Sequence, residues 1–406
     1  MLRNAMLCPS CSYLAAMNPR VTIITLNWNG WQDTIECLES LYCVDYDNYH
    51  IILVDNASTD ESLAKIDAYC SNQRKLTPYS AEHLIRNKQT RITHYDEVSA
   101  EPGTGRGGEA VRLQANSALT VIQNDQNYGF AEGNDIAVKY ALDTLHPDYV
   151  LLLNNDTVVN KHFLRALVNA AEYDQQIGVM QSKILRYADT TIESTGIKDD
   201  VLLYSTFRGL FETDEGQYDN ERECGFFYAS GACVFIRLGF LEALGGECFD
   251  PQLFAYYEDV DLSWMARLLG YKVAYCPESV CYHKGSATFG VGTAIVLYLS
   301  HRNRLRVMIK NYSLRTLIFV LPLTIVLKGS LLTYDWIVNY DSSYLFSFLR
   351  ALSWNLLNLR SALILRERIQ SKRKLPDHEI MKYMIPYSFG VRSALKDQRR
   401  RRKSEN

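Results

Sequence analysis

The sequence lacks, at the places where they would act, the two glycine-rich loops that many nucleotide-binding enzymes use to hold phosphate groups. It contains no G-x-x-x-x-G-K-[ST] loop, and no G-x-G-x-x-G follows the first expected strand. These absences argue against a P-loop NTPase and against a dinucleotide-dependent oxidoreductase. A phosphate-bearing ligand would therefore need another source of positive charge.

The amino-terminal segment Met1–Ala16 has no continuous apolar run, so we expect no signal peptide there. The segment matches nothing else in the chain, and the first strand pattern begins just after Met17. We therefore treat residues 1–19 as an N-terminal extension and expect translation to start at Met17. A peptide beginning at Met1, found in protein from its native source, would contradict this expectation.

The 10 cysteines show no pairing pattern. Cys233, Cys276 and Cys281 lie inside apolar runs, as buried and reduced thiols do, which favours a cytosolic compartment. Cys8 and Cys11 form a C-x-x-C, but no second pair stands at metal-binding spacing. A zinc or redox site is therefore not expected there.

The composition is that of an ordinary globular protein. Hydrophobic residues make up 47% of the 406 residues, with 27 Tyr and 15 Phe. These figures exclude collagen-like, disordered and disulfide-scaffold classes. The length fits one large domain with an appendage, or two domains.

The net charge of −3 hides an asymmetry. From Arg366 onward there are 13 Lys and Arg against 5 Asp and Glu, a local charge of +8 that leaves −11 for the rest of the chain. A basic tail typically faces membrane headgroups or nucleic acid, although a solvated, disordered tail has the same composition. Because no aromatic residues are interleaved near Arg399–Lys403, we expect no nucleic-acid partner.

Short apolar runs alternate with segments of helical spacing through the first half of the chain. This alternation predicts a parallel sheet covered by helices on both faces, and the second half has a more mixed pattern. The expected strands are Val21–Asn27, Ile51–Val54, Leu119–Ile122, Tyr149–Leu153, Ile177–Met180, Phe226–Ile236 and Lys272–Tyr275. The expected helices are Trp31–Tyr42, one opened by a capping box at Ser58–Glu61, Phe130–Leu142, one after Asn160, and Asp259–Leu269.

Residues 71–116 break this alternation. They are polar and contain four closely spaced glycines, Gly103, Gly105, Gly107 and Gly108. We interpret the segment as a variable insertion.

After His301 the chain becomes apolar in two stretches. The run Thr316–Leu327 is too short for a span of about 20 residues and contains Pro322. The second stretch, Tyr344–Leu365, is interrupted by Arg350 and Arg360. Three interpretations remain open, namely a pair of helices in the membrane interface, true membrane spans, and ordinary packing against the body.

Polar side chains follow three of the expected strands at the point where each ends. They are Asn27-Trp28-Asn29-Gly30, Asp55-Asn56 and Asn154-Asn155-Asp156. In open parallel sheets, ligands bind past the carboxyl ends of the strands, so these residues predict one crevice. Turn formation alone would explain any single exit. The carboxylate of Asp156 is a hard oxygen ligand, which suits Mg²⁺ or Mn²⁺. Such a cation would supply the positive charge that a diphosphate needs.

Six motifs in order carry a resemblance to a known family. They are VTIITLNWNG, ILVDNASTD, NYGFAEGND, YVLLLNNDT, YYEDVDLSW and YHKGS. The chain resembles family 2 of the inverting glycosyltransferases, and within it the rhamnosyltransferase-like branch. This resemblance implies an α/β protein of the GT-A type over residues 20–311, with a Rossmann-like mixed sheet flanked by helices. The resemblance does not extend to residues 312–406, which we expect to form a helical, partly apolar, membrane-associating segment that ends in the basic tail.

The resemblance also implies a nucleotide-sugar site. Thr25 and Asn27 match the strand exit that lies against the nucleotide, and Asp55 matches the acid that holds the base. The segment that closes over the nucleoside is matched by Asn127, Gly129 and Asn134. Asn154, Asn155 and Asp156 stand where many relatives have Asp-x-Asp, whose last Asp binds the metal; here the first acid is Asn. His283 matches a histidine that completes the metal site in some relatives, and a structural hydrogen-bonding role is its alternative.

The resemblance also implies that Asp259 is the catalytic base, since it matches the Asp of the Glu-Asp pair in the family's acidic motif. Inversion is consistent with this, because it needs a carboxylate on the face opposite the leaving diphosphate. Glu258 and Asp261 are expected either to fix the start of their helix or to contact the acceptor. Gly231 matches a small residue near the sugar, although close packing would explain it equally well. Arg302 resembles a basic residue able to hold an acceptor pyrophosphate, and a solvated helix face is its alternative.

The expected function is transfer of a sugar, of the dTDP-rhamnose kind, to a hydroxyl of a surface-polysaccharide or lipid-linked glycan. The expected cofactor is Mg²⁺ or Mn²⁺, and the expected location is the cytoplasm, at the inner face of the cell membrane and its anionic lipids. Two alternatives are a transferase acting on a polyprenyl phosphate and a nucleotide-sugar-binding protein without turnover.

Overall fold

The computed structural model describes residues 18–70, 92–96, 119–285, 293–340 and 342–385. Side chains of Cys70 and of residues 92–96 are outside this description. The expected extension 1–19 therefore lies almost wholly outside the described residues. The same holds for most of the 71–116 insertion and for Arg399–Lys403 in the basic tail.

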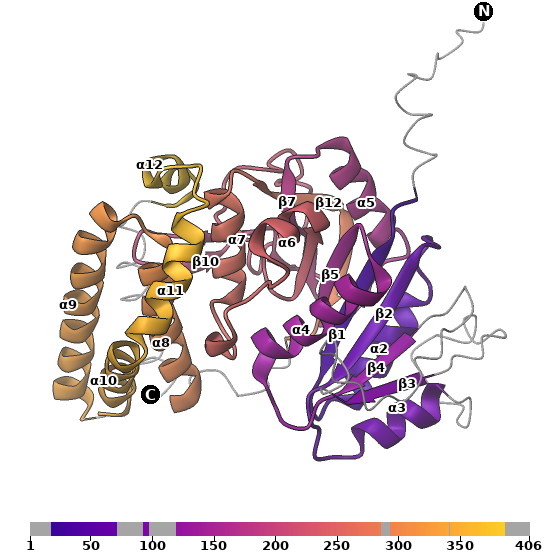
Figure 1. Cartoon of the computed structure of the whole chain (residues 1–406), viewed down its shortest axis with the longest axis horizontal. Helices are drawn as coiled ribbons and strands as arrows, with labels where there is room; N and C mark the ends of the chain where they lie inside the picture. The colour runs from indigo at the N-terminus through magenta and orange to yellow at the C-terminus, as the bar shows by residue number, and fades with distance from the viewer. Residues whose placement is uncertain (1–17, 71–91, 97–118, 286–292, 341, 386–406) are drawn as a thin grey trace, which may run out of the picture.

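One mixed sheet of 10 strands forms the centre of the described structure (Figure 1). The strands run in the order β3 (Ile92–Asp96), β4 (Leu119–Gln123), β2 (Tyr49–Asp55), β1 (Val21–Asn27), β5 (Tyr149–Asn154), β11 (Cys233–Arg237), β7 (Ile177–Arg186), β12 (Lys272–His283) and β6 (Thr157–Val159), with β8 (Ile192–Ser194) paired to β7. The strands from β3 to β5 are parallel, while β11 is antiparallel to both of its neighbours. The expectation of a Rossmann-like mixed sheet is confirmed.

Alternating residues of each strand pack against opposite layers of helices, as a period of two requires. In β1, Ile24 faces one core and Ile23 the other. The first core is closed by α4 (Gly129–Tyr140), α6 (Leu238–Leu244) and α7 (Glu258–Leu268). The second is closed by α2 (Trp31–Leu41), α3 (Ser62–Cys70) and α5 (Phe163–Tyr173).

Several elements differ from the expectation. The residues 71–116 contain β3, which pairs in parallel with β4. The expected strand Phe226–Ile236 is regular only from Cys233. No capping box forms at Ser58, whose hydroxyl is bonded to Asp55; Asp60 instead accepts the N–H of Ser62. The Ser58 hydroxyl bonds to Asp55 at the end of β2 instead of capping the helix that its sequence pattern predicts.

A group of helices packs at the end of the molecule opposite to β2, β3 and β4 (Figure 1). Its centre is α8 (Ala294–Asn311), which is contacted by α9 (Leu314–Asn339), α10 (Ser343–Leu357) and α11 (Leu359–Gln370). Ile369, Ile380 and Met384 join the core beneath α7. The short helix α12 (Asp377–Ile380) is tied to Ser313 through Asp377.

Helix α9 contradicts the expectation that the apolar run is too short to cross a membrane. It continues through Pro322 and Lys328 for 26 residues, about 39 Å. Pro322 lies inside the helix, on an exposed side. Among the described helices, α9 is the one whose length and composition would allow a span. The second stretch forms two helices, separated at Asn358.

Candidate active site

The exits of β1 and β2 are held together by one carboxylate. Asp55 has no exposed surface, and its Oδ1 accepts hydrogen bonds from Asn27 (2.8 Å) and from the Ser58 hydroxyl (2.6 Å). Its Oδ2 accepts the backbone N–H of Ser58 at 3.0 Å. Parallel pairing places Asn27 beside Asp55, which explains the contact. A nucleotide base would therefore reach Asp55 by displacing Ser58.

The expected role of Thr25 is corrected by its position. Its side chain is fully buried, two residues before the end of β1 and on the side of the sheet that packs against α2. A residue this far from the edge of the sheet cannot face a nucleotide past the strand ends. Thr25 therefore packs α2 against the sheet.

Asn56 is the centre of a network that shapes the segment after β4. Its Nδ2 donates to Asn127 Oδ1 (2.9 Å) and to the carbonyl of Gly129 (3.0 Å). Its Oδ1 accepts Asn124 Nδ2 at 2.9 Å and the N–H of Tyr128 at 3.1 Å. Asn127 thus shapes the turn before α4.

Asn134, expected to close over the nucleoside, is hydrogen-bonded within its own helix. It is 2% exposed, and its Nδ2 donates to the carbonyl of Phe130 one turn earlier, at 2.8 Å. The neighbouring Gly133 packs closely on β1, because a Cβ at this position would lie 2.5 Å from Leu26 Cδ1. This part of α4 packs on β1.

The exit of β5 meets the end of β12. Strand β6 pairs antiparallel with β12, with Thr157 opposite His283, which brings Asp156 beside the imidazole. Asp156 Oδ1 lies 3.2 Å from His283 Nε2, and Asn154 Nδ2 lies 3.4 Å from the same nitrogen. Asn155 points elsewhere, donating to Thr34 at 2.9 Å.

On its other side, His283 Nδ1 lies 2.8 Å from Glu193 Oε1, in β8. Burial by itself would lower the pKa of His283, but hydrogen bonds and charges of Asp156 and Glu193 raise that pKa to about 10. Without a metal, the imidazole is therefore a cation between two acids. Glu193 had no signal in the sequence, because an isolated acid between strands resembles any surface residue.

Asp156 and His283 fit a divalent cation that shares its coordination with a ligand. Their 3.2 Å separation is close to the roughly 3.0 Å between neighbouring ligands of an octahedral ion. Glu193 accepts the Nδ1 proton, which leaves the Nε2 lone pair for a metal. Among the described residues, no group of three His, Cys, Asp or Glu is arranged to hold a metal alone. An ion here would need oxygens from a bound molecule, as Mg²⁺ does with phosphates.

Asp259 lies in the first turn of α7, beside Gly231. Gly231 precedes β11, which is the neighbour of β5 in the sheet. Asp259 Oδ2 accepts the N–H of Gly231 at 3.1 Å, and its Oδ1 accepts the N–H of Val260 at 2.8 Å. A Cβ on Gly231 would lie 3.5 Å from the Asp259 carboxylate. Burial raises the pKa of Asp259 to about 6, against the lowering effect of these backbone donors. Such a carboxylate is suited to accept a proton near neutral pH.

The two neighbouring acids have different surroundings. Glu258 is buried, and burial followed by the charge of Asp259 raises its pKa well above the ordinary value. Asp261 is fully buried and forms an ion pair with Lys310, while Asn311 donates to its Oδ1 at 2.7 Å. The expectation that Asp261 contacts an acceptor is therefore wrong, because its oxygens anchor α7 to α8.

Between the end of the short helix η3 (Pro251–Leu253) and α7, the backbone is strained. Phe254 (φ 64°, ψ −65°), Tyr256 (φ 71°) and Tyr257 (φ 70°) all have positive φ values. At Phe254 the N–H of Ala255 bonds to the carbonyl of Leu253, which closes a rare γ-turn. Each such residue costs on the order of 1–3 kcal/mol and needs support from outside the segment.

Helix α8 supplies that support with residues expected to face either solvent or an acceptor. Arg302 is 8% exposed, and its Nη2 donates to the carbonyls of Gln252 and Leu253 at 2.7 and 2.6 Å. Its guanidinium also stacks over Trp354, 4.5 Å from the ring centre. Both expectations for Arg302 are therefore wrong, since a buried arginine with these partners holds neither an acceptor pyrophosphate nor a solvated face.

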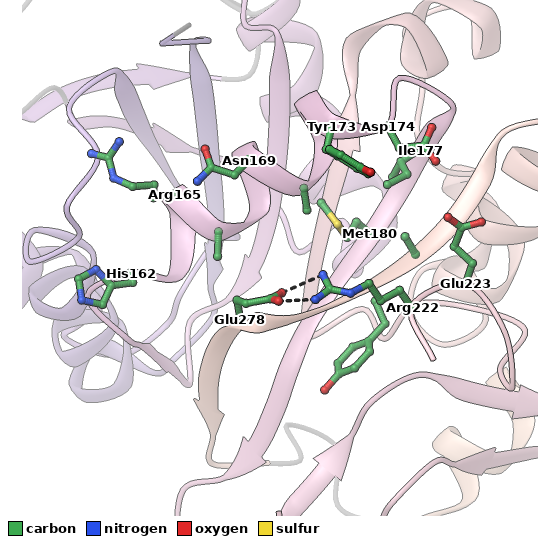
Figure 2. A pocket seen from close by; sticks show the side chains of 14 residues that line it. His162, Arg165, Asn169, Tyr173, Asp174, Ile177, Met180, Arg222, Glu223 and Glu278 are labelled. Carbon is green, nitrogen blue, oxygen red and sulfur yellow. Dashed lines mark hydrogen bonds and ion pairs between the residues drawn. The ribbon is translucent and has the colours of Figure 1, made fainter. Parts of the chain in front are cut away.

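A separate hollow of about 550 Å³ lies beside α5 (Figure 2). Its wall includes Ile177 and Ala274, at the amino-terminal ends of β7 and β12, and the ion pair of Arg222 with Glu278. It contains no residue of the expected site. We therefore place the candidate active site at the carboxyl ends of the strands, where Asn27, Asn154, Asp156, Gly231 and Asp259 gather.

Comparison with known proteins gives a family. Residues 22–89 match the sequence profile described as "Glycosyl transferase family 2", and residues 109–306 match the profile "Glycosyltransferase like family 2". The low-salt glycan biosynthesis hexosyltransferase Agl10 of Haloferax volcanii is 23% identical over 227 residues, 56% of this chain and 71% of that protein. The rhamnosyltransferase WbbL of Escherichia coli is 23% identical over 163 residues, which is 38% of this chain and 61% of that protein.

Among solved structures, the mannosyltransferase PcManGT of Pyrobaculum calidifontis, in complex with GDP-Man and Mn²⁺, is similar over 88% of each chain. Its TM-score is 0.45 at 15% identity, too low to support an argument about the site. The two profiles cover most of the segment from Thr22 to Arg306, including every expected nucleotide, metal and base residue. The chain belongs to family 2 of the glycosyltransferases.

Proposed function

We propose that this glycosyltransferase works with inversion and that Asp259 is its base. The observation that carries the proposal is a short connection between two acids. Asp259 accepts the N–H of Gly231, and the carbonyl of the next residue, Ala232, accepts the N–H of Asn154 at 3.0 Å. Asp156 follows Asn154 by two residues. The proposed base and the proposed metal site therefore lie on either side of the contact between the end of β5 and the turn before β11.

The reaction follows from the groups at that edge. As the acceptor oxygen bonds to the anomeric carbon, Asp259 takes the hydroxyl proton, and the bond to the diphosphate breaks with its electron pair. A pKa raised to about 6 keeps Asp259 ionised at neutral pH while leaving it more basic than an ordinary aspartate.

Asp156 and His283 would hold the cofactor, Mg²⁺ or Mn²⁺. When bound, such a cation supplies positive charge to a diphosphate leaving group. Because imidazole nitrogen is a softer ligand than Mg²⁺ prefers, we expect Mn²⁺ to bind better. Glu193 would fix the histidine ring, as carboxylates behind metal-binding histidines do.

The donor proposed is a nucleotide-diphosphate sugar of the dTDP-rhamnose kind, with the nucleoside between the Asn27–Asp55 pair and the Asn56 network. The match to a rhamnosyltransferase supports this choice of sugar. The acceptor proposed is a hydroxyl of a surface-polysaccharide or lipid-linked glycan. The hexosyltransferase relative, named for glycan biosynthesis, supports a glycan acceptor.

The proposed location is the cytoplasm, at the inner face of the cell membrane. Helix α9 exposes Ile318, Phe319 and Val326, with Phe319 73% exposed. Helices α10 and α11 add Leu356, Leu357 and Ile364. Exposed arginines on all three helices, Arg315, Arg350 and Arg360, suit anionic headgroups around an apolar surface. Free thiols at every cysteine side chain in the described ranges fit a reducing compartment.

The proposal is tested by donor binding and hydrolysis across UDP-, GDP- and dTDP-sugars, with Mn²⁺, Mg²⁺ or EDTA. We expect one donor to bind with a metal, Asp156→Ala to weaken that binding, and Asp259→Asn to bind without turnover. Asp189→Asn, in an exposed turn, is the matched control and should resemble wild type. Binding without hydrolysis or transfer by wild type would favour the alternative of a non-catalytic binder. Products formed on a bare polyprenyl phosphate rather than a lipid-linked glycan would favour the other alternative.

A further inference from the structure

The side chain of Asn303 lies against three backbone carbonyls of the strained segment before Asp259. Its Nδ2 is 2.8 Å from the carbonyl oxygens of Leu253 and Ala255, and 2.7 Å from that of Tyr256. The residue has no exposed surface. In the described ranges, no other side-chain amide donates a hydrogen bond to the carbonyls of Leu253, Ala255 and Tyr256.

The orientation of this amide is fixed by its surroundings. Its Oδ1 accepts the Nε–H of Arg302 at 2.8 Å. Turning the amide over would place that oxygen among three carbonyl oxygens, where it would be repelled, and would point the NH₂ group at a guanidinium. Asn303 is therefore a donor to the segment and to nothing else.

The segment cannot hold its own shape. Phe254, Tyr256 and Tyr257 are bulky residues at positive φ, and such residues relax unless neighbouring groups over-determine them. The last of them is the N-cap of α7, directly before Glu258 and Asp259. Any relaxation would therefore move the carboxylate that accepts the Gly231 N–H.

We propose that Asn303 is a positioning residue that sets the Asp259 carboxylate by binding the carbonyls of Leu253, Ala255 and Tyr256. The inference rests on the proposed function, since it assigns Asn303 to the base of that reaction. Asn303 touches neither reacting atoms nor substrate. It acts through the backbone between residues 253 and 259.

Two ion pairs make this role separable from folding. Arg306 binds Asp250 at 2.5 Å before the segment, and Lys310 binds Asp261 after it. Both pairs are buried and join α8 to the same part of the chain. Loss of Asn303 should thus free the middle of the segment while α8 stays docked.

The test compares Asn303→Ala with Asn355→Ala. Asn355, on α10, is 7% exposed, and its Nδ2 also donates to two carbonyls, those of Arg302 and Ala351, both at 2.9 Å. It makes no bond to the segment 253–259. The two variants therefore remove similar buried amides. The amide of Asn303 contacts the segment before Asp259, and the amide of Asn355, on α10, does not.

The first measurement is hydrogen–deuterium exchange of peptides spanning residues 252–260, which needs no substrate. We expect exchange there to accelerate at least 10-fold in Asn303→Ala and to stay within 2-fold of wild type in Asn355→Ala. The second is hydrolysis of the nucleotide sugar that wild type binds. We expect Asn303→Ala to lower kcat about 100-fold with KM for the donor within 2-fold, as for a displaced reacting group.

A second variant, Asn303→Asp, keeps the shape of the side chain and its bond to Arg302 but removes the donors. We expect its kcat to be at least as low as that of Asn303→Ala, with the acid limb of its pH–rate profile shifted from that of wild type. Equal kcat losses in the Asn303 and Asn355 variants, or unchanged exchange at 252–260 in Asn303→Ala, would overturn the inference. If wild type hydrolysed no donor, the proposed function would fail, while the exchange data would still decide whether Asn303 clamps the segment.

Discussion

Asp259 and Gly231 are joined by a 3.1 Å hydrogen bond from the glycine N–H to the carboxylate Oδ2. The bond connects the start of α7 to the turn before β11, the strand that lies beside β5. The geometry at this bond underlies the first prediction.

Replacement of Asp259 by Asn should abolish turnover without loss of donor binding. The amide has nearly the same shape but cannot accept the acceptor proton, so we expect kcat to fall 10²–10⁴-fold. In wild type, the rate should be present above pH 6 and fall as pH drops through about 6, where Asp259 becomes protonated. Steady-state kinetics from pH 4.5 to 8.5 with the best donor measure both effects. A wild-type rate independent of pH between 5 and 7 would contradict the assignment.

The second prediction concerns His283 in metal-free protein. Its pKa is about 10 when folded, above the ordinary 6.5, so the folded state binds this proton more tightly than the unfolded state. The resulting stabilisation, on the order of a few kcal/mol, is complete below pH 6.5 and is lost as pH rises through 10. Denaturant unfolding in EDTA at pH 6 to 10 should show this loss in wild type and a flatter profile in His283→Gln.

The control for that measurement is His162→Gln, a histidine on the surface that pairs with Asp45. Its profile should follow wild type. Addition of Mn²⁺ at pH 7 should release one proton, since the metal takes the place of the Nε2 proton. Calorimetry in buffers of different ionisation enthalpy would detect that release. Metal binding with no proton release would show that His283 is not a ligand.

The third prediction separates steric from conformational cost at two glycines. Gly129 has φ +75°, and a Cβ there would lie 2.4 Å from the carbonyl oxygen of Phe254. Gly285 has φ +68° with nothing within 4 Å of such a Cβ. Gly285→Ala should cost about 1–2 kcal/mol, the price of a left-handed backbone alone.

Gly129→Ala should cost more than this, and it should also lower kcat, because the clash displaces Phe254 and the segment leading to Asp259. Urea unfolding and donor hydrolysis of the two variants measure these effects side by side. Equal stabilities and equal rates would indicate that Phe254 can move away freely.

The fourth prediction concerns the apolar surface of α9. Serine at both Ile318 and Phe319 should greatly reduce co-flotation with vesicles that contain phosphatidylglycerol, because two exposed apolar side chains would no longer enter the lipid. Tyr173→Ser, which changes an 85% exposed aromatic residue on α5, should bind as wild type does. If the Ile318 and Phe319 variant floated as well as wild type, the lipid contact would have to lie elsewhere.

The sequence was most informative where function depends on residues close together in the chain. The runs that became β1, β5 and α7 were expected within one or two residues of their observed ends. Asp156 and Asp259 were identifiable because each follows a recognisable local pattern, namely a strand exit and a helix start. The resemblance to family 2 rests on the same local motifs.

Roles that depend on distant partners were beyond the sequence. The sequence around Arg302, Lys310 and Asn311 is equally typical of a solvated helix face. Their burial follows from α10 and α11 packing over α8, a contact that no local pattern encodes. Asp261 was misassigned for the same reason, since its partner Lys310 is 49 residues away.

The sequence by itself determined the fold class, the chemical groups of the site and the family, because periodicity and strand-end motifs are properties of neighbouring residues. Only the tertiary structure decided which polar groups remain available to a ligand and which are used up inside the protein. It joined Asp156 to His283 and Glu193, used Asp261 to anchor α7 to α8, and placed Asn303 against the backbone that leads to Asp259. The physical reason is that burial and hydrogen-bond satisfaction are fixed by packing between distant segments.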